Sequence, residues 1–368
     1  MSHAHNSLSV NEATDMILTM GDTVSFLLVG HMGFGKTTSG RVIAEVLKET
    51  HRLCYFNCTT KVDGSDLTLP KFKDLDTADY VSYVPNEELG LHLSDRKPIL
   101  MLDEIGKNPN LLPPLTEVLQ ERSLNGKKFL DGNIVFATTN YGSENVGDGF
   151  KAHENDRITQ LPIRKPTPME WVVWGINNNI DPALLGFAKE TPAIFADYRD
   201  IDDPRENQYI FHPGAPERSS FVTGRSLERA SKIISRARQS DSITDDMVKI
   251  ALINTIGVRG ALDLNAYLKL ADKMPRMADI KATPDKAIVP DNITALCMVV
   301  FNALSAVESD WVTQWMEYLV RLPKEAQHMF VNGVTDKKFD PMKQAKFFRN
   351  KAFSKWILDN KHIFTARQ

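Results

Sequence analysis

A glycine-rich stretch near the start of the chain, LLVGHMGFGKTTSG, holds the first residues whose types and spacing could do chemistry. It fits the pattern G-x-x-x-x-G-K-[ST] at Gly30, Gly35, Lys36 and Thr37, with Gly33 inside the loop. We expect the three glycines to adopt backbone dihedrals that other residues avoid, so that loop N–H groups converge on phosphate oxygens. The lysine of such a loop reaches the β- and γ-phosphates, and the hydroxyl after it is a ligand for Mg²⁺. The stretch therefore predicts a site for a nucleoside triphosphate with Mg²⁺.

The flanks of this loop favour the same interpretation. An apolar run at residues 26–29 predicts a strand before the loop, and TTSGRVIAEVLKE predicts an amphipathic helix after it. We expect the helix to start near Lys36 and to point the positive end of its dipole at the bound anion. Thr38 is expected to contact the α-phosphate. A chance glycine-rich turn would have neither flank.

The stretch PILMLDE, residues 98–104, places two acids directly after four apolar residues. A buried strand that ends at Asp103 would bring this carboxylate beside the glycine-rich loop, where it orients the water shell of Mg²⁺. Glu104 is the candidate base that polarises an attacking water. A strand that simply ends in a polar turn would look similar, but the preceding phosphate-binding motif favours the catalytic interpretation.

A third apolar strand, in NIVFATTN at residues 133–140, ends at Asn140. At this position a polar side chain would sit between the loop and the acidic pair, where it positions the water or senses the γ-phosphate. Asparagine after a strand is commonly a turn residue. The spacing to the other motifs favours a functional role for Asn140.

The elements that must position these residues are visible as alternating patterns. From residue 23 to about 166, the apolar runs VSFLLV, LCYFNC, PILMLD, NIVFATT and ITQLPI alternate with helical stretches. Continuous apolar strands between helices predict an α/β fold with a parallel sheet buried on both faces. The domain organisation we predict is a helix at 1–20, an α/β core at 21–178, a connecting loop region at 179–222, a helical lid at 223–283 and a C-terminal helical extension at 284–368.

Composition limits the remaining function classes. With 368 residues and a net charge of −3, the chain suits two or three domains and is not a polyanion binder as a whole. Its three cysteines have neither a disulfide framework nor zinc-site spacing. The start of the chain has no signal-peptide pattern, and no apolar run is long enough for a membrane span. We expect a cytoplasmic protein with no membrane partner.

Together these motifs resemble the AAA+ ATPases, and within them the MoxR-like and dynein-related group. The resemblance covers roughly residues 20–280 and is carried by GHMGFGKT, VPNEELGLHLSDRKPILMLDEIGKNPN, LLPPLTEVLQERSLNGKKFLDGNIVFATTN and ENDRI. In the third stretch, Asn125-Gly126 stands where this group has a tight β-hairpin turn. The resemblance implies an AAA+ P-loop NTPase fold with sheet order 5-1-4-3-2, ATP and Mg²⁺ as cofactors, and a homo-oligomeric ring, usually a hexamer, with nucleotide between neighbours.

The resemblance also implies two functional arginines. Arg157, in ENDRI just before the fifth strand, matches the finger that completes a neighbouring subunit's site, and Arg164 is the alternative. Arg225, in SSFVTGRSLERAS, matches the sensor-2 position at the start of a lid helix. Gly224 replaces the proline common there, so Arg229, one helical turn on, is the alternative.

The C-terminal segment lies outside the resemblance. Residues 321–368 hold eleven Lys and Arg against four Asp and Glu. The stretch KQAKFFRNKAFSKWIL predicts one helix face with Phe348, Ala352 and Trp356 and basic residues around it. A docking helix with a solvated basic face is the preferred interpretation, and contact with nucleic acid or an acidic partner is the alternative.

The function that the resemblance implies is remodelling of a protein partner, often one with a von Willebrand A-type domain. A nucleic-acid motor or loader with the same ATPase is the alternative, which the near-neutral charge does not favour. A nucleotide-gated scaffold that barely turns over is a third interpretation, against which Glu104, Asn140 and Arg157 argue.

Overall fold

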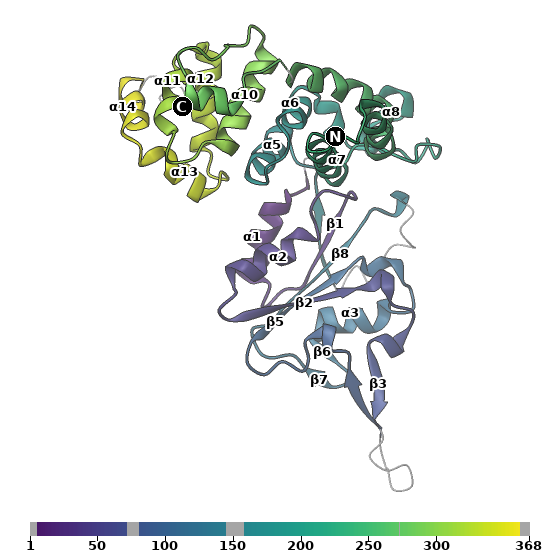
Figure 1. The fold of residues 1–368 in the computed structure, drawn as a ribbon. Coiled ribbons are helices and arrows are strands. Elements are labelled where there is room, and N and C mark those ends of the chain that lie inside the picture. Colours follow the sequence, from purple (N-terminus) through teal and green to yellow (C-terminus); the bar gives the residue numbers. More distant parts are fainter. Residues whose placement is uncertain (1–5, 72–80, 145–157, 272, 361–368) are drawn as a thin grey trace. The chain divides into compact units, whose positions relative to one another are not determined.

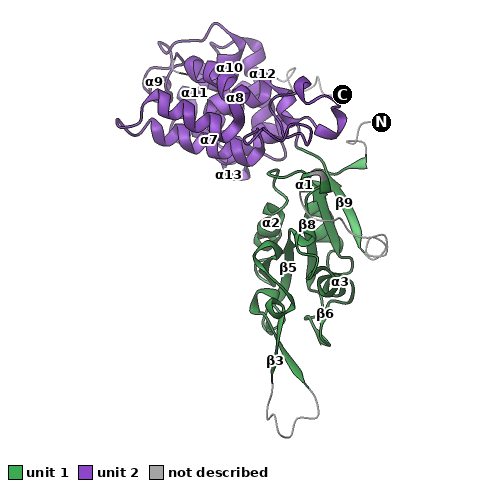
Figure 2. Cartoon of the chain, turned by 90° about the vertical axis from the view of Figure 1, so that its right-hand side faces the viewer, with its two compact units in different colours: residues 1–165 green, residues 166–368 purple. Residues whose placement is uncertain are grey.

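A computed structural model of the chain describes residues 6–71, 81–144, 158–271 and 273–360. The chain divides into two compact units, residues 1–165 and residues 166–368 (Figure 2). Among the helices of the described ranges, none combines the length and the apolar character that crossing a bilayer requires. Arg157 lies outside the described residues.

A five-stranded parallel sheet forms the centre of the first unit (Figure 1). Its strand order is β2-β5-β8-β1-β9, which is the predicted order 5-1-4-3-2 read from the other edge. The predicted fold class, an α/β P-loop NTPase, is confirmed. The strands are β1 Phe26–Gly30, β2 His51–Asn57, β5 Lys97–Asp103, β8 Ile134–Thr139 and β9 Thr159–Ile163.

Helices cover both faces of this sheet because its central strands are apolar on both sides. Helices α1 (Val10–Met20) and α2 (Thr38–Val46) lie on one face, and α3 (Leu112–Glu121) lies on the other (Figure 2). Within β1, Phe26 belongs to the core under α1 and α2, and the next residue, Leu27, belongs to the core under α3. This alternation is what a strand buried on both faces requires.

Two small antiparallel hairpins extend from the first unit. Strands β3 (Thr68–Lys71) and β4 (Ser82–Pro85) form one of them. Strands β6 (Ser123–Leu124) and β7 (Lys127–Lys128) form the other. Between β6 and β7, Asn125 has φ 50° and Gly126 has φ 77°. A two-residue turn with both φ values positive is what Asn-Gly favours, so the predicted hairpin turn is confirmed.

The second unit is helical. Its central helix α10 packs against α6, α12 and α5. The α-helices are α5 Pro168–Asn177, α6 Pro182–Glu190, α7 Gly224–Ala237, α8 Asp245–Ala271, α9 Met277–Ala282, α10 Ile293–Ala306, α11 Val312–Leu319, α12 Lys324–Thr335, α13 Pro341–Phe348 and α14 Lys351–Asp359.

The first part of the second unit differs from the predicted domain pattern in two places. The region 179–222, predicted as a connecting loop, contains the buried helix α6, which Asp181 caps and Pro182 begins. Prolines and acids are common in loops, but they are also common at the start of helices, so composition did not distinguish a loop from a helix here. The boundary between the two compact units falls between residues 165 and 166 rather than after residue 178, because α5 packs against α6 of the second unit.

The stretch KATPDKAIVPDN, predicted as a linker between lid and extension, is held by the C-terminal helices. Tyr318 donates a hydrogen bond to the carbonyl of Ile288 at 2.7 Å, and Arg321 donates to the carbonyl of Pro284. The predicted lid and the predicted extension therefore belong to one compact unit.

The predicted basic helix at the C-terminus is two helices. Helix α13 ends at Phe348, and Asn350 caps a new helix, α14, by accepting from the backbone N–H groups of Ala352 and Phe353. The expected face of Phe348, Ala352 and Trp356 on one helix is therefore wrong. The break turns Phe353 into the core, where it is fully buried, and leaves Phe348 half-exposed. An asparagine side chain that caps a new helix favours a break at that residue over continuation of the preceding helix.

Candidate nucleotide site

The loop between β1 and α2 has the backbone that the glycine pattern predicts at two of its three glycines. Gly33 has φ 75° and Gly35 has φ 90°. None of the described atoms lies within 4 Å of the position that a Cβ on Gly35 would take, so the loop faces open space there. The positive φ favours glycine at both positions, and at Gly35 crowding plays no part.

The reason for glycine at position 30 is different from the predicted one. Gly30 is the last residue of β1 and has no positive φ. A Cβ there would lie 2.8 Å from the carbonyl oxygen and 2.9 Å from the Cβ of Ile163, its partner on β9. The small residue lets β9 run close beside the strand that leads into the loop.

Lys36 is folded into the loop that it follows. Its side-chain ammonium donates to the carbonyls of Gly30 at 2.7 Å and His31 at 2.8 Å, and to Oδ1 of Asn140 at 2.7 Å. The residue is only 8% exposed, so the charge is held at the loop rather than in solvent. Thr38 is exposed at the first turn of α2, and its N–H donates to the carbonyl of Gly35.

Asp103 ends β5 with its carboxylate under the loop. The hydroxyl of Thr37 donates to its two oxygens at 3.2 and 3.3 Å. The hydroxyl of Tyr55 on β2 donates to Oδ2 at 2.7 Å, and that of Thr138 on β8 donates to Oδ1. Three hydroxyl groups therefore surround a carboxylate that is 7% exposed.

Glu104 has a left-handed backbone, with φ 59° and ψ 42°. A non-glycine residue there costs on the order of 1–3 kcal/mol and persists only where its surroundings enforce it. Here the backbone N–H of Glu104 donates to Oγ1 of Thr138 at 3.2 Å. The turn carries the Glu104 side chain out of the line of β5 and towards Asn140 and Lys107, whose Nζ lies 3.1 Å from Oε2 of Glu104.

Asn140 joins the loop to the acidic pair. Its Oδ1 accepts from Lys36, and its Nδ2 donates to the two carboxylate oxygens of Glu104 at 3.1 and 3.3 Å. One amide therefore uses its acceptor on the ammonium and its donor on the carboxylate, which fixes its orientation. The predicted position between the two motifs is where the structure places this side chain.

Sequence reasoning missed a second link between the loop and the segment after β8. The buried carboxylate of Glu144 lies 2.9 Å from Nδ1 of His31 and accepts from the backbone N–H of Met32 at 3.0 Å. His31 also contacts the ring of Tyr141 edge-on, with ring centroids 4.9 Å apart. A histidine in the variable part of the loop was the available signal, but the sequence does not show which acid it meets.

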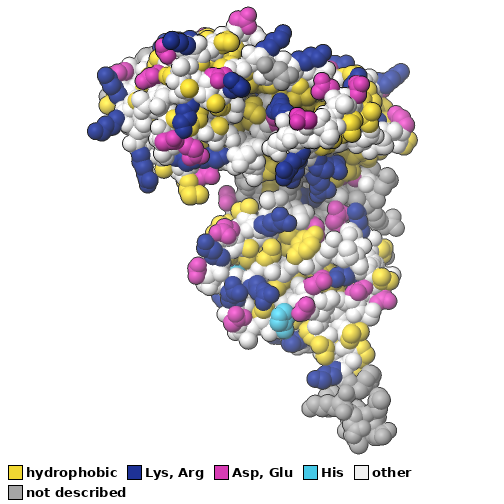
Figure 3. Space-filling model, viewed as in Figure 1, with side chains coloured by type: hydrophobic (Ala, Val, Ile, Leu, Met, Phe, Trp, Pro, Cys, Tyr) yellow, Lys and Arg dark blue, Asp and Glu magenta, His cyan; other side chains and the backbone are white. Residues whose placement is uncertain are grey.

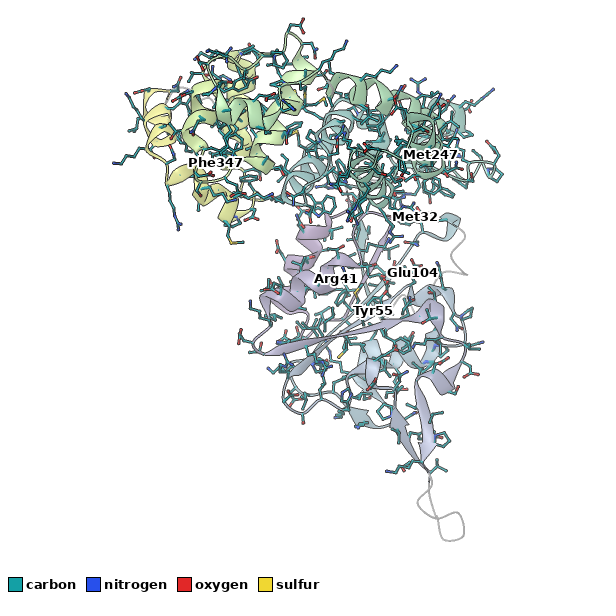
Figure 4. All side chains as sticks on the ribbon, in the orientation of Figure 1. Met32, Arg41, Tyr55, Glu104, Met247 and Phe347 are labelled. Carbon is teal, nitrogen blue, oxygen red and sulfur yellow. The ribbon has the colours of Figure 1, made fainter. Side chains whose placement is uncertain are left out.

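Sequence reasoning also missed the two hydroxyls beside Asp103. Tyr55 and Thr138 lie on the strands that flank β5, so the sheet order is needed to find them. Partial burial and the hydrogen bond to Asp103 raise the pKa of Tyr55 above its ordinary value, so its phenol is protonated at neutral pH and donates. Figure 4 shows Tyr55 and Glu104 at the same edge of the sheet.

The described geometry does not test the roles of the arginines predicted from the resemblance. Arg164 follows β9, where its backbone N–H donates to the carbonyl of Leu8 and its guanidinium to that of Lys165. Arg225 and Arg229 are both exposed on α7 of the second unit. The roles of these arginines stay predictions.

The cluster fits a phosphate ligand with Mg²⁺. The loop has open space beside Gly35 and holds the Lys36 ammonium against its own carbonyls. The hydroxyl of Thr37 lies beside the carboxylate of Asp103. Hydroxyl, carboxylate and phosphate oxygens are the ligands that Mg²⁺ prefers, with water completing its shell. Within the described residues there is no cluster of three or more His, Cys, Asp or Glu side chains that would hold a metal without such a ligand.

No family model matches the chain, and no curated protein matches it. Similar solved structures include the RuvB Holliday junction branch migration motor of Thermotoga maritima, with 18% identity over 85% of this chain and 86% of that chain and a TM-score of 0.34. NtrX from Brucella abortus is 15% identical over 97% of this chain and 68% of that chain, with a TM-score of 0.38. A putative ATPase from Cytophaga hutchinsonii is 12% identical over 70% and 88%, with a TM-score of 0.29.

Proposed function

We propose that this protein is an AAA+ ATPase that binds ATP with Mg²⁺ at the loop of residues 30–37 and hydrolyses it. The observation that carries the proposal is the bridge by Asn140, which links Lys36 to Glu104 beside the pair of Thr37 and Asp103. This cluster contains a phosphate-binding cation, a metal-binding hydroxyl and carboxylate, and a second carboxylate beside them. Phosphoryl transfer needs these parts for positioning and charge stabilisation.

Each residue has a distinct role in this proposal. The Lys36 ammonium and the loop N–H groups bind the phosphates, and Thr37 and Asp103 hold Mg²⁺. When bound, Mg²⁺ neutralises charge on the phosphate oxygens. Glu104, whose side chain is 26% exposed, accepts the proton of the attacking water. Asn140 orients the Glu104 carboxylate through its amide donor.

The finer assignments rest on the resemblance of the motifs. They are membership of the MoxR-like group, a hexameric ring, Arg157 as a finger in trans, Arg225 as sensor 2, a cytoplasmic location and a protein partner with a von Willebrand A-type domain. A nucleic-acid motor would need a free basic surface at the C-terminus. Two of the lysines there are paired with acids, Lys338 with Glu170 at 3.2 Å and Lys346 with Glu308 at 2.5 Å. Figure 3 shows basic and acidic side chains interspersed on the face of the second unit that it presents.

The experiment that tests the proposal measures ATP binding and phosphate release for Lys36→Ala and Glu104→Gln. Lys36→Ala should not bind ATP, because the loop loses its ammonium. Glu104→Gln should bind ATP but release phosphate about 10²- to 10⁴-fold more slowly, because an amide cannot accept the proton. Glu45→Gln is the matched control, since Glu45 is an exposed glutamate on α2 that pairs with Lys48. Turnover of Glu104→Gln at the wild-type rate would remove Glu104 from the mechanism.

A further inference from the structure

The carboxylate of Asp103 is held from both sides by hydroxyls on the neighbouring strands. Strand β5 lies between β2 and β8 in the sheet. From β2, Tyr55 donates to Oδ2 at 2.7 Å, and from β8, Thr138 donates to Oδ1. The contacts of Thr37 to both oxygens are longer, at 3.2 and 3.3 Å. The orientation of the carboxylate is therefore set by the flanking strands rather than by the loop.

Tyr55 lies outside the buried cores of the first unit. Its side chain is 41% exposed, and it belongs to neither of the two buried cores of the first unit. It lies on β2, the outermost strand on one side of the sheet, and on the sheet face that α2 covers, where Arg41 lies (Figure 4). Among the described residues, the hydrogen-bond partner of its hydroxyl is Asp103. What the side chain offers beyond phenylalanine is thus a donor to the carboxylate.

We propose that Tyr55 is a positioning residue that orients Asp103 for Mg²⁺ and so sets the metal dependence of nucleotide binding. This inference rests on the proposed function. Side chains that donate to a metal-binding carboxylate fix its orientation, and removing one typically lowers metal affinity about 10- to 100-fold. Tyr55 acts only through Asp103, so its loss leaves the Lys36 contacts with phosphate in place.

The test is the Mg²⁺ dependence of binding of a fluorescent ATP analogue, measured for the wild type and Tyr55→Phe. This substitution removes one oxygen from a half-exposed ring, so folding is retained. In EDTA the two proteins should bind the analogue with affinities within about twofold of each other, as for an ordinary surface change. On addition of Mg²⁺, the concentration that gives half of the gain in affinity should be about 10- to 100-fold higher for Tyr55→Phe.

Tyr209→Phe is the matched control. It removes a hydrogen bond of the same kind, from Tyr209 to Oδ2 of Asp263 at 2.5 Å, in the second unit. It should not shift the Mg²⁺ midpoint. The same midpoint for the wild type and Tyr55→Phe would overturn the inference and leave the proposed ATPase standing. An equal loss of affinity with and without Mg²⁺ would also overturn it, since that is a structural effect. Failure of the wild type to bind the analogue in either condition would overturn the proposed function instead.

Discussion

At the loop edge of the first unit, the buried side chains include Lys36 and Asp103, while the C-terminal helices of the second unit bury Trp315, Phe330 and Phe353. The ammonium and the carboxylate are hydrogen-bonded to backbone, hydroxyl and amide groups. The aromatic rings instead pack on one another, with centroids of Phe330 and Trp315 5.3 Å apart.

This difference separates a chemical role from a structural one. Burial of a charge is unfavourable unless it is paired, whereas burial of an aromatic ring is favourable by itself. The first unit also keeps a strained backbone at Glu104, and such strain concentrates at functional sites. In the second unit, several buried polar groups serve as helix caps, such as Asp181 and Thr223. We therefore expect substitutions in the cluster around Lys36 and Asp103 to change turnover and those in the aromatic core of the second unit to change stability.

The largest expected effect is that of Arg157→Ala, if the finger acts across a subunit boundary. Turnover should fall on the order of 10³- to 10⁵-fold with ATP binding retained. A mixture of Arg157→Ala and Glu104→Gln subunits should recover activity, because the first supplies Glu104 and the second supplies the arginine. Phosphate release is measured after subunit exchange. No recovery above the separate mutants, in rings verified to be mixed, would contradict a finger in trans, and Arg164→Ala tests the alternative.

The sharpest test of the second unit is Phe330→Ala. Phe330 is fully buried against Trp315, Phe347 and Phe353. Its loss should lower the free energy of unfolding by about 3–5 kcal/mol, measured by urea denaturation. Phe348→Ala should lower the free energy of unfolding much less, because Phe348 is 46% exposed. Equal effects of the two substitutions would show that this cluster is not a packed core.

A smaller effect is expected for Glu144→Ala, at the link between the loop and the segment after β8. The substitution removes the carboxylate that the N–H of Met32 and the ring of His31 contact. Loss of a partner by a buried polar group lowers the free energy of unfolding by about 1–3 kcal/mol. Thermal unfolding should show this loss in the first unit, and bound ATP analogue should partly restore stability. Glu144→Gln keeps an acceptor for Met32 and should lose less. If Glu144→Ala unfolds like the wild type, this link does not stabilise the loop.

The smallest effect on stability is expected for Arg225→Ala. Arg225 is exposed on α7, and alanine favours a helix, so the free energy of unfolding should change by about 0.5 kcal/mol or less. Turnover should nevertheless fall, because a sensor arginine couples nucleotide state to assembly. Phosphate release from Arg225→Ala and Arg229→Ala distinguishes the two candidates. A silent Arg225→Ala with an impaired Arg229→Ala would move the sensor role one turn along the helix.

Several features of this protein follow from the sequence because their physics is local. The positive φ angles at Gly33, Gly35, Asn125 and Gly126 occur where short motifs call for them. The apolar runs predicted the strands of the sheet, and an acid or an amide at a strand end predicted Asp103, Glu104 and Asn140 as neighbours of the loop. Carboxyl ends of parallel strands meet at one edge, so this expectation needed only the fold class.

Other features were decided by the tertiary structure alone. Tyr55, Thr138 and Glu144 contact the site from other strands and segments, and their partners depend on sheet order and on the path of the chain. The requirement for glycine at position 30 comes from the neighbouring strand β9 rather than from the loop. Helix α6 and the break at Asn350 were missed because the same prolines, acids and asparagines that punctuate loops also cap helices, and packing of the buried faces selects between the two.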